Sequence, residues 1–517
     1  MNNKLNADEF SAQINALLDE GDHAQALSLC ASLELPEDDA DMKVTILMMR
    51  AFSHMAAGDT DQAVSNQLAA FSAADELPAV EQLGIAEGAL KVQMPFDFCA
   101  ELFTRSAERF EREGEDCAMA AGAFNKAGIC LFRHGASTAA EKHCFYRALK
   151  CMDSVEDDAL SKEHRDVLKA LIQSNLAECL SREGEPGQAM ELYEEAADVF
   201  GKYLGNEDNM CLTHYAICQR CLSDIYRHSD ENIRAHTCLS RSITELERRR
   251  KKLSDQLKLH LAVCYNARGT LRFQMGDYEG EVDDCTRSLQ LREDLDDDPN
   301  AKATVISNRA EAYSMLKQYD AARDDFLRAI DILDAIPESI SAAVSAATRS
   351  YSLGLLYFEQ NMHEQSCGPL RSAADRLAII RSRATDDMEY TYDQLTDIEA
   401  LARMRLSASL YQCRERDYFD TMTEAREAIR LTELLPLTAE RAARLAALHL
   451  SLSELLEILD EHEAARDEYE IAEDFRDEGI ALALSELGPD DGEESIYEDF
   501  DDESGIWEDF SDNTPQG

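Results

Sequence analysis

The chain has 517 residues, of which 103 are Asp or Glu and 51 are Lys or Arg, giving a formal net charge of −52. This charge disfavours nucleic acid and anionic lipid as partners, because phosphate binding needs Lys and Arg clustered over a wide face. No window approaches eighteen uninterrupted apolar residues, and the first residues carry no signal-peptide pattern. We therefore expect a soluble, cytoplasmic protein that binds neither nucleic acid nor a membrane.

One pattern recurs along the chain. Its clearest copy lies between Ile306 and Ala329, where two apolar stripes with intervals of three and four flank a polar turn at residues 317–320. Ala310 and Ala322 occupy the positions where two helix backbones must approach closely. The pattern predicts two amphipathic helices folded back on each other, and its repetition predicts a stacked array.

The copies follow one another along most of the chain. Aligned on the first small residue of each second helix, their anchors are Ala26, Ala63, Ala100, Ala140, Ala189, Ala235, Glu281, Ala322, Ser366, Thr421 and Ala465. Glu281 departs from the small-residue rule, although Gly280 beside it could serve instead. No stretch of alternating Val, Ile and Thr indicates a sheet, so the sequence predicts an all-α protein.

This pattern resembles the tetratricopeptide repeat, a helix-turn-helix unit with small residues at the helix contact and aromatic residues around them. Strong matches are Phe124-Asn-Lys-Ala-Gly128 and Asn175-Leu-Ala177. The resemblance covers nearly all of residues 10–487 and implies a right-handed α-solenoid of about eleven repeats. The mean step of about 44 residues exceeds the standard 34, so we expect each helix to be longer by a turn or more.

Two segments interrupt the regular spacing. The step from the ninth anchor to the tenth is longer than the others and includes residues 380–395, which predict either a longer helix pair or a junction between two solenoid blocks. After Gly488-Pro489 the helical pattern stops. Residues 488–517 hold twelve Asp or Glu and no Lys or Arg, a composition that predicts a disordered tail.

The tail contains a duplicated motif, Ile-aromatic-Glu-Asp-Phe, with its two copies ten residues apart. Its apolar residues are Ile496, Tyr497 and Phe500, then Ile506, Trp507 and Phe510. Trp507 is the single tryptophan of the chain. Three interpretations are open: a bivalent docking element for a partner, a segment that folds onto the protein's own groove, and a solubilising tail with incidental aromatic residues.

The resemblance also implies that the first helices line a groove for extended peptides or partner helices. Four repeats carry an asparagine just before the small packing residue, namely Asn125, Asn175, Asn266 and Asn308. An amide both donates and accepts hydrogen bonds, so such a row could hold a peptide backbone. The alternative is that each asparagine bonds a neighbouring helix of the protein itself.

Arg248, Arg249, Arg250, Lys251 and Lys252 form the one dense basic run of this acidic chain. The run lies at the C-terminal end of a predicted second helix, where the helix dipole favours cations and where Glu245 and Glu247 are near. A second interpretation is an electrostatic dock for an acidic partner or for the tail.

The fifteen cysteines are spread along the predicted helices, which indicates buried, reduced thiols rather than a disulfide framework. Cys211, His214, Cys218 and Cys221 share one helical stripe. Four ligands on one straight helix cannot close a tetrahedron, so core packing is favoured over a zinc site, although Cys218 and Cys221 could ligate an ion with His236 or Cys238. We expect no metal and no cofactor.

No phosphate loop, nucleophile elbow or zinc-protease motif is present, so the sequence favours a protein without enzymatic activity. The leading hypothesis is a scaffold or adaptor that binds peptide or helical segments of partner proteins in its groove, with the tail as a second docking element. The alternative is a regulatory sensor whose curvature changes when it binds a small ligand or a signalling peptide.

Overall fold

The computed structural model describes residues 7–486 except 37–38, 92–93, 115, 157–159, 206–208, 294, 296, 337–338, 384–389 and 414–417. Within these residues all regular structure is helical, with twenty-two α-helices, one short 3-10 helix and no strand. In the same part of the chain, no helix has the length and apolar character needed to cross a membrane. The acidic tail and its duplicated motif, residues 488–517, lie outside the described residues.

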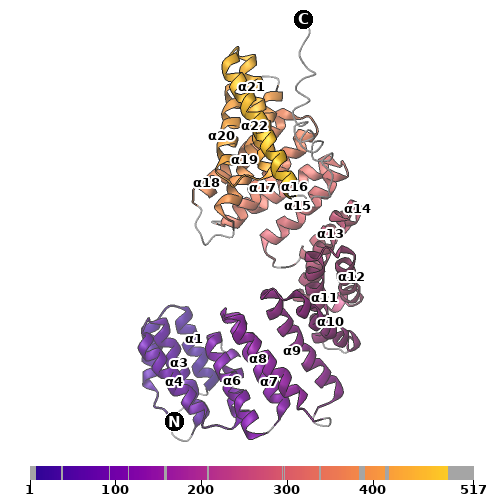
Figure 1. Ribbon diagram of the computed structural model, residues 1–517. Helices are drawn as coiled ribbons and strands as arrows, with labels where there is room; N and C mark the ends of the chain where they lie inside the picture. Colours follow the sequence, from indigo (N-terminus) through magenta and orange to yellow (C-terminus); the bar gives the residue numbers. More distant parts are fainter. Residues whose placement is uncertain are drawn as a thin grey trace. The chain divides into compact units, whose positions relative to one another are not determined.

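The chain divides into two compact units between His260 and Leu261 (Figure 1). This division falls inside α13 (Asp255–Gln274). The junction predicted near residues 380–395 lies within the second unit, and residues 384–389 of that segment are not among those described. It therefore stays a prediction.

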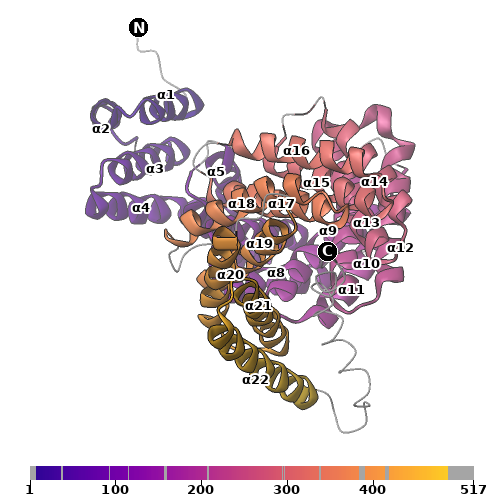
Figure 2. The ribbon, with the colours of Figure 1, turned by 90° about the horizontal axis from the view of Figure 1, so that it is seen from above.

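The first unit consists of helix pairs that run side by side in succession (Figures 1 and 2). Its helices are α1 (Ala7–Asp19), α2 (His23–Ser32), α3 (Ala40–Ala56), α4 (Thr60–Ala74), α5 (Ala79–Lys91), α6 (Phe96–Glu113), α7 (Cys117–His134), α8 (Thr138–Asp153), α9 (Lys162–Arg182), α10 (Pro186–Lys202), α11 (Met210–His228), α12 (Asn232–Arg248) and the 3-10 helix η1 (Arg250–Lys252). Phenylalanines such as Phe103, Phe124 and Phe145 are fully buried between the helices.

The second unit continues the same arrangement. Its helices after α13 are α14 (Tyr278–Arg292), α15 (Pro299–Met315), α16 (Tyr319–Asp334), α17 (Ile340–Glu359), α18 (His363–Arg381), α19 (Tyr392–Gln412), α20 (Tyr418–Glu433), α21 (Ala439–Ile458) and α22 (His462–Glu486). The clearest predicted copy is confirmed, because its two stripes form α15 and α16. Its turn is shorter than predicted, since α16 already begins at Tyr319.

The predicted anchors lie near the start of the even-numbered helices. In most pairs the anchor is the fourth residue of its helix, as are Ala189 in α10 and Ala322 in α16, and both are fully buried. The fourth pair is shifted by one residue: Ala140 is half-buried, and Glu141 takes the fully buried position. Two repeats therefore place a glutamate, Glu141 or Glu281, where the others place a small residue.

Glu281 fits because the facing helix carries a glycine. A Cβ atom added at Gly269 would lie 3.5 Å from Cγ of Glu281, so the glycine leaves room for the longer side chain. The adjacent Gly280, which the sequence offered as a substitute, does not fill this position, because a Cβ there would meet Asp277 of the preceding turn. The Glu281 side chain is only 2 % exposed, and its Oε2 has no hydrogen-bond partner among the residues that the structure describes.

The turn within each helix pair repeats one backbone conformation. In eight pairs a residue with positive φ precedes the second helix by two positions: Gly21, Gly58, Gly184, Asp230, Gly276, Lys317, Asn361 and Asp460. Glycine adopts this left-handed conformation without steric cost, whereas a residue with a Cβ does not. The turn is therefore a shared feature of the repeats even where the sequence lacks glycine.

Small residues allow the closest helix approaches, as the sequence predicts. A Cβ atom added at Gly128 of α7 would lie 2.6 Å from the Phe145 ring of α8. One added at Gly354 of α17 would lie 2.5 Å from Leu370 of α18. Any larger side chain at either glycine would push the two helices of its pair apart.

Each of two neighbouring helix pairs in the second unit has a buried ion pair between its two helices. Arg268 of α13 donates to both carboxylate oxygens of Asp284 of α14, at 2.8 and 2.7 Å. Arg309 of α15 binds Asp325 of α16 in the same two-pronged geometry, at 2.7 and 2.9 Å. Both contacts join the two helices of one repeat, and the fork geometry fixes their relative position.

Twelve of the fifteen cysteines are buried, as the sequence predicts. All fifteen are free thiols, and only Cys117, Cys367 and Cys413 are partly exposed. Burial raises the pKa of many of these thiols, for example that of Cys130 to about 11, so they remain protonated at neutral pH.

Candidate functional site

The first unit carries an apolar hollow on its odd-numbered helices, which we name the α5–α9 hollow. Its volume is about 590 Å³, and α5, α7 and α9 supply most of its wall, with Met210 at the start of α11 completing it. The apolar residues that line it are Val80, Leu83, Ala118, Met119, Ala123, Leu160, Val167, Leu168, Leu171 and Met210.

Several of these apolar side chains are held open to solvent. Val80 is 57 % exposed, Met119 40 % and Met210 37 %, so their helices place them outside the packed core. Gly84 and Gly122 also line the hollow, and a Cβ atom added at either would meet no atom within 4 Å. The two glycines therefore widen the hollow and expose backbone on its floor.

Charged groups lie at the edge of the hollow and are already paired. Lys126 Nζ forms an ion pair with Glu87, which joins α7 to α5. Asp116 caps α7 by accepting hydrogen bonds from the backbone N–H groups of Ala118 and Met119, each at 3.1 Å. With these charges satisfied locally, the open surface of the hollow is mainly apolar, and its two flexible methionine side chains can adapt to different ligand shapes.

The four predicted asparagines form two pairs. Asn175 Nδ2 of α9 donates to Oδ1 of Asn125 of α7 at 2.9 Å. Asn308 Nδ2 of α15 donates to Oδ1 of Asn266 of α13 at 3.2 Å. Each bond links the first helices of neighbouring repeats, as in the alternative that the asparagines bond the protein itself. A role in peptide binding stays a prediction.

The basic run is partly engaged within the protein. Arg249 donates to Oε2 of Glu245 at 3.0 Å and to the backbone carbonyl of Leu204 at 2.7 Å. Arg248 also pairs with Glu245, and Arg250 pairs with Glu247 at 3.4 Å. Lys251 and Lys252 are exposed on η1. These local pairs match the structural interpretation of the run, and its role as a dock stays a prediction.

The cysteine stripe of α11 is part of the core. Cys211, Cys218 and Cys221 are buried, and the ring of His214 stacks on Phe200 with centroids 5.4 Å apart. Burial lowers the pKa of His214 and raises that of Cys221. In the part of the chain that the structure describes, no three His, Cys, Asp or Glu side chains are placed to hold a metal ion.

The sequence analysis did not identify the hollow. Val80 and Met119 are apolar residues away from the packing stripes of weak repeat copies, and Gly84 and Gly122 lie near them in sequence. An apolar residue that lies outside the packing stripe of its helix and close to a glycine is the one feature of the sequence that indicates such a hollow. It does not reveal which neighbouring helices leave space between them.

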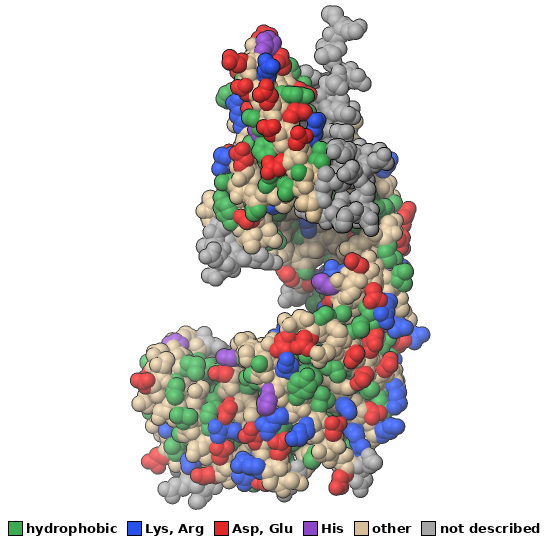
Figure 3. Space-filling view, viewed as in Figure 1, with side chains coloured by type: hydrophobic (Ala, Val, Ile, Leu, Met, Phe, Trp, Pro, Cys, Tyr) green, Lys and Arg blue, Asp and Glu red, His purple; other side chains and the backbone are tan. Residues whose placement is uncertain are grey.

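Acidic and basic side chains are mixed on the face of the two units that Figure 3 draws. On the face drawn in Figure 3, red and blue groups are interspersed, with apolar side chains between them. On this face no single sign of charge forms a continuous stripe, although the whole chain is strongly acidic.

No protein-family model and no curated protein matches the sequence. Solved structures do match the fold. One is a signal-transduction ATPase of the STAND class with a tetratricopeptide repeat sensor, from Pyrococcus horikoshii: identity is 12 %, 97 % of this chain and 68 % of that chain are covered, and the TM-score is 0.51.

Two further structures match with lower scores. RapI in its apo form has 12 % identity and a TM-score of 0.46, and the match covers 77 % of this chain and 97 % of that one. BtubC from P. vanneervenii has 17 % identity and a TM-score of 0.38, with 46 % and 90 % covered. At these identities the likeness is one of fold. The eleven helix pairs, their buried anchors and the match to the repeat sensor together identify this chain as a protein of the tetratricopeptide-repeat fold.

Proposed function

We propose that this protein is a non-enzymatic scaffold that binds an apolar segment of a partner protein in the α5–α9 hollow. The observation that carries the proposal is an apolar hollow of about 590 Å³ on consecutive first helices, with Val80, Met119 and Met210 held open to solvent. Exposed apolar surface of this kind marks interaction sites, because it gains free energy only when a partner covers it.

The hollow favours a particular kind of segment. Its wall is aliphatic, so an amphipathic helix or extended peptide with apolar side chains at spaced positions would fill it. The chain carries a net charge of −52, which attracts basic partners and speeds their encounter. We therefore expect a segment with apolar anchors and basic flanking residues. In this proposal the acidic tail at 488–517 is a second docking element, and the scaffold needs no catalysis.

A peptide-display selection on the whole chain tests the proposal. Peptides selected on the unaltered protein are measured against Met119→Glu, which places a charge in the hollow at an exposed position, and against Ile233→Glu as a control. Ile233 is 78 % exposed on α12, away from the hollow. We expect Met119→Glu to weaken binding at least about tenfold, or roughly 1.4 kcal/mol, and Ile233→Glu to leave it unchanged. Peptides that bind all three proteins equally would exclude the hollow as the site.

A further inference from the structure

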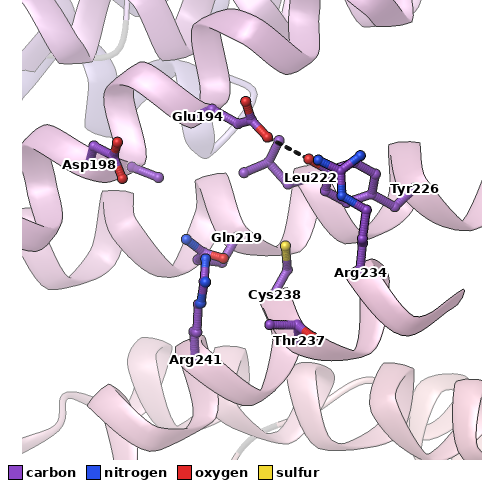
Figure 4. A pocket seen from close by; sticks show the side chains of 10 residues that line it. Glu194, Asp198, Gln219, Leu222, Tyr226, Arg234, Thr237, Cys238 and Arg241 are labelled. Carbon is purple, nitrogen blue, oxygen red and sulfur yellow. Dashed lines mark hydrogen bonds between the residues drawn. The ribbon is translucent and has the colours of Figure 1, made fainter. Parts of the chain in front are cut away.

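A second hollow, the α10–α12 pocket, lies between α10, α11 and α12 of the first unit and has a volume of about 340 Å³ (Figure 4). Unlike the α5–α9 hollow it is lined largely by polar and charged side chains. Glu194 and Asp198 come from α10, Gln219 and Tyr226 from α11, and Arg234 and Arg241 from α12.

One side of the pocket is internally satisfied. The hydroxyl of Tyr226 donates a hydrogen bond of 2.5 Å to Glu194, shown as the dashed line in Figure 4. The guanidinium of Arg234 lies over the Tyr226 ring, 4.5 Å from its centroid, and pairs with Glu231 at 2.9 Å. These contacts link the three helices and make this side a fixed wall.

The other side presents unmatched polar groups. Asp198 and Arg241 are exposed side chains on facing helices, and among the described residues neither has a hydrogen bond or an ion pair, with each other or with a third group. Between them lies Gln219, which is 4 % exposed and whose Oε1 has no hydrogen-bond partner within the described chain. Figure 4 shows the Gln219 amide extending toward Arg241, with Asp198 beyond it.

A buried acceptor without a donor costs about 1–3 kcal/mol, and this cost is recovered when a ligand supplies the donor. The unmatched groups call for different partners. Arg241 pairs with an anion, whereas Asp198 and the Gln219 carbonyl accept hydrogen bonds from a cation such as an ammonium group. A single ion of either sign would satisfy only part of this set.

We propose that the α10–α12 pocket binds a small zwitterion with an amine and a carboxylate, the chemical class of the free amino acids. The carboxylate of the ligand pairs with Arg241, and its amine donates to Gln219 Oε1 and to Asp198. Ala197 and Leu222 supply the apolar surface beside the ligand's carbon chain. The volume is at the small end of ligand pockets, which suits one amino acid better than a protein segment. This site is independent of the α5–α9 hollow.

Isothermal titration calorimetry on the whole chain at low salt tests the proposal. The probes are glycine, β-alanine, 4-aminobutyrate, L-glutamine and L-arginine, which vary the distance between charges and the length of the chain. Acetate, propionate, methylamine and ethylamine each carry one of the two charges alone. We expect at least one zwitterion to bind with a Kd below about 1 mM and the singly charged compounds to bind at least about tenfold more weakly.

Matched variants connect the binding to the pocket. Arg241→Gln and Asp198→Asn each remove one charge at an exposed position, so circular dichroism should show an unchanged fold. We expect each to weaken binding at least about tenfold, whereas Arg328→Gln, an exposed arginine on α16, leaves it unchanged. Absence of binding by every zwitterion, equal binding of the singly charged compounds, or binding insensitive to both pocket variants would overturn the proposal. Met119→Glu should not affect zwitterion binding, so the two sites can fail separately.

Discussion

Glu281 gives the sharpest test of how the repeats pack, because it places an ionisable group where most repeats place a small residue. Burial, with the nearby carboxylates of Glu311 and Asp284, raises the pKa of Glu281 from 4.5 to about 8. Between pH 4.5 and about 8, Glu281 therefore keeps its proton in the folded chain but has released it in the unfolded chain. The effect of Glu281 on the free energy of unfolding is therefore zero below pH 4.5, becomes steadily more destabilising as the pH rises from 4.5 to about 8, and is constant above that.

The magnitude follows from the two pKa values. At about 1.4 kcal/mol for each tenfold change in proton affinity, the raised pKa corresponds to roughly 5 kcal/mol above pH 8 and roughly 2 kcal/mol at pH 6. Glu281→Gln keeps the shape of the protonated side chain and removes its titration. We expect the variant to be more stable than the unaltered protein, by an excess that grows by about 2–3 kcal/mol between pH 6 and pH 9.

Urea-induced unfolding, followed by circular dichroism from pH 6 to pH 9, measures this difference. The range stays above the isoelectric point of about 4.5. Glu279→Gln is the matched control, because Glu279 is exposed on the same helix, and its curve should run parallel to that of the unaltered protein. Glu311→Gln removes a charge that raises the pKa of Glu281, so the loss of stability should still begin near pH 4.5 but should level off at a lower pH and be smaller. If the Glu281→Gln and unaltered curves stay parallel throughout, the raised pKa is not a property of this group.

Two substitutions test the contacts between paired helices, again by urea unfolding. Replacing Arg309 by Leu leaves the buried carboxylate of Asp325 without its two-pronged partner, and we expect a loss of about 3–5 kcal/mol; a loss below about 1 kcal/mol would contradict this. Gly128→Ala forces a methyl group against the Phe145 ring and should cost about 1–3 kcal/mol. Gly122→Ala in the same helix meets no neighbour and should gain about 0.5–1 kcal/mol, so equal effects at the two glycines would refute the packing argument.

Much of the fold is predictable from the sequence because each repeat is a local unit. The spacing of Ala310 and Ala322 predicts two helices and their contact without reference to any other part of the chain. Glu141 shows the limit of this approach. Its carboxylate is stabilised at the buried fourth position of α8 by an ion pair with Arg182 and a hydrogen bond from the thiol of Cys179, both on α9. These contacts join residues about forty positions apart in the sequence.

The candidate sites were less accessible to sequence reasoning. The asparagine row was visible as a pattern, but whether Asn125 and Asn175 face a ligand or each other depends on the distance between two helices. The hollow and the pocket depend on space left between three or more helices, and no residue type encodes that space. Gln219 shows this plainly, because a glutamine in a helical stripe becomes informative only once its carbonyl is found buried with no donor in the described part of the chain.

The residues with positive φ in the turns affect the thermal stability of the array. Lys317 and Asp230 adopt a conformation that costs an ordinary residue about 1–2 kcal/mol and that glycine adopts freely. Replacing either residue by glycine would remove this cost, although the greater conformational freedom of glycine in the unfolded chain would offset part of the gain in stability. Because the repeats contribute to stability almost independently, such substitutions would raise the thermal stability one turn at a time and would leave the α5–α9 hollow and the α10–α12 pocket unchanged.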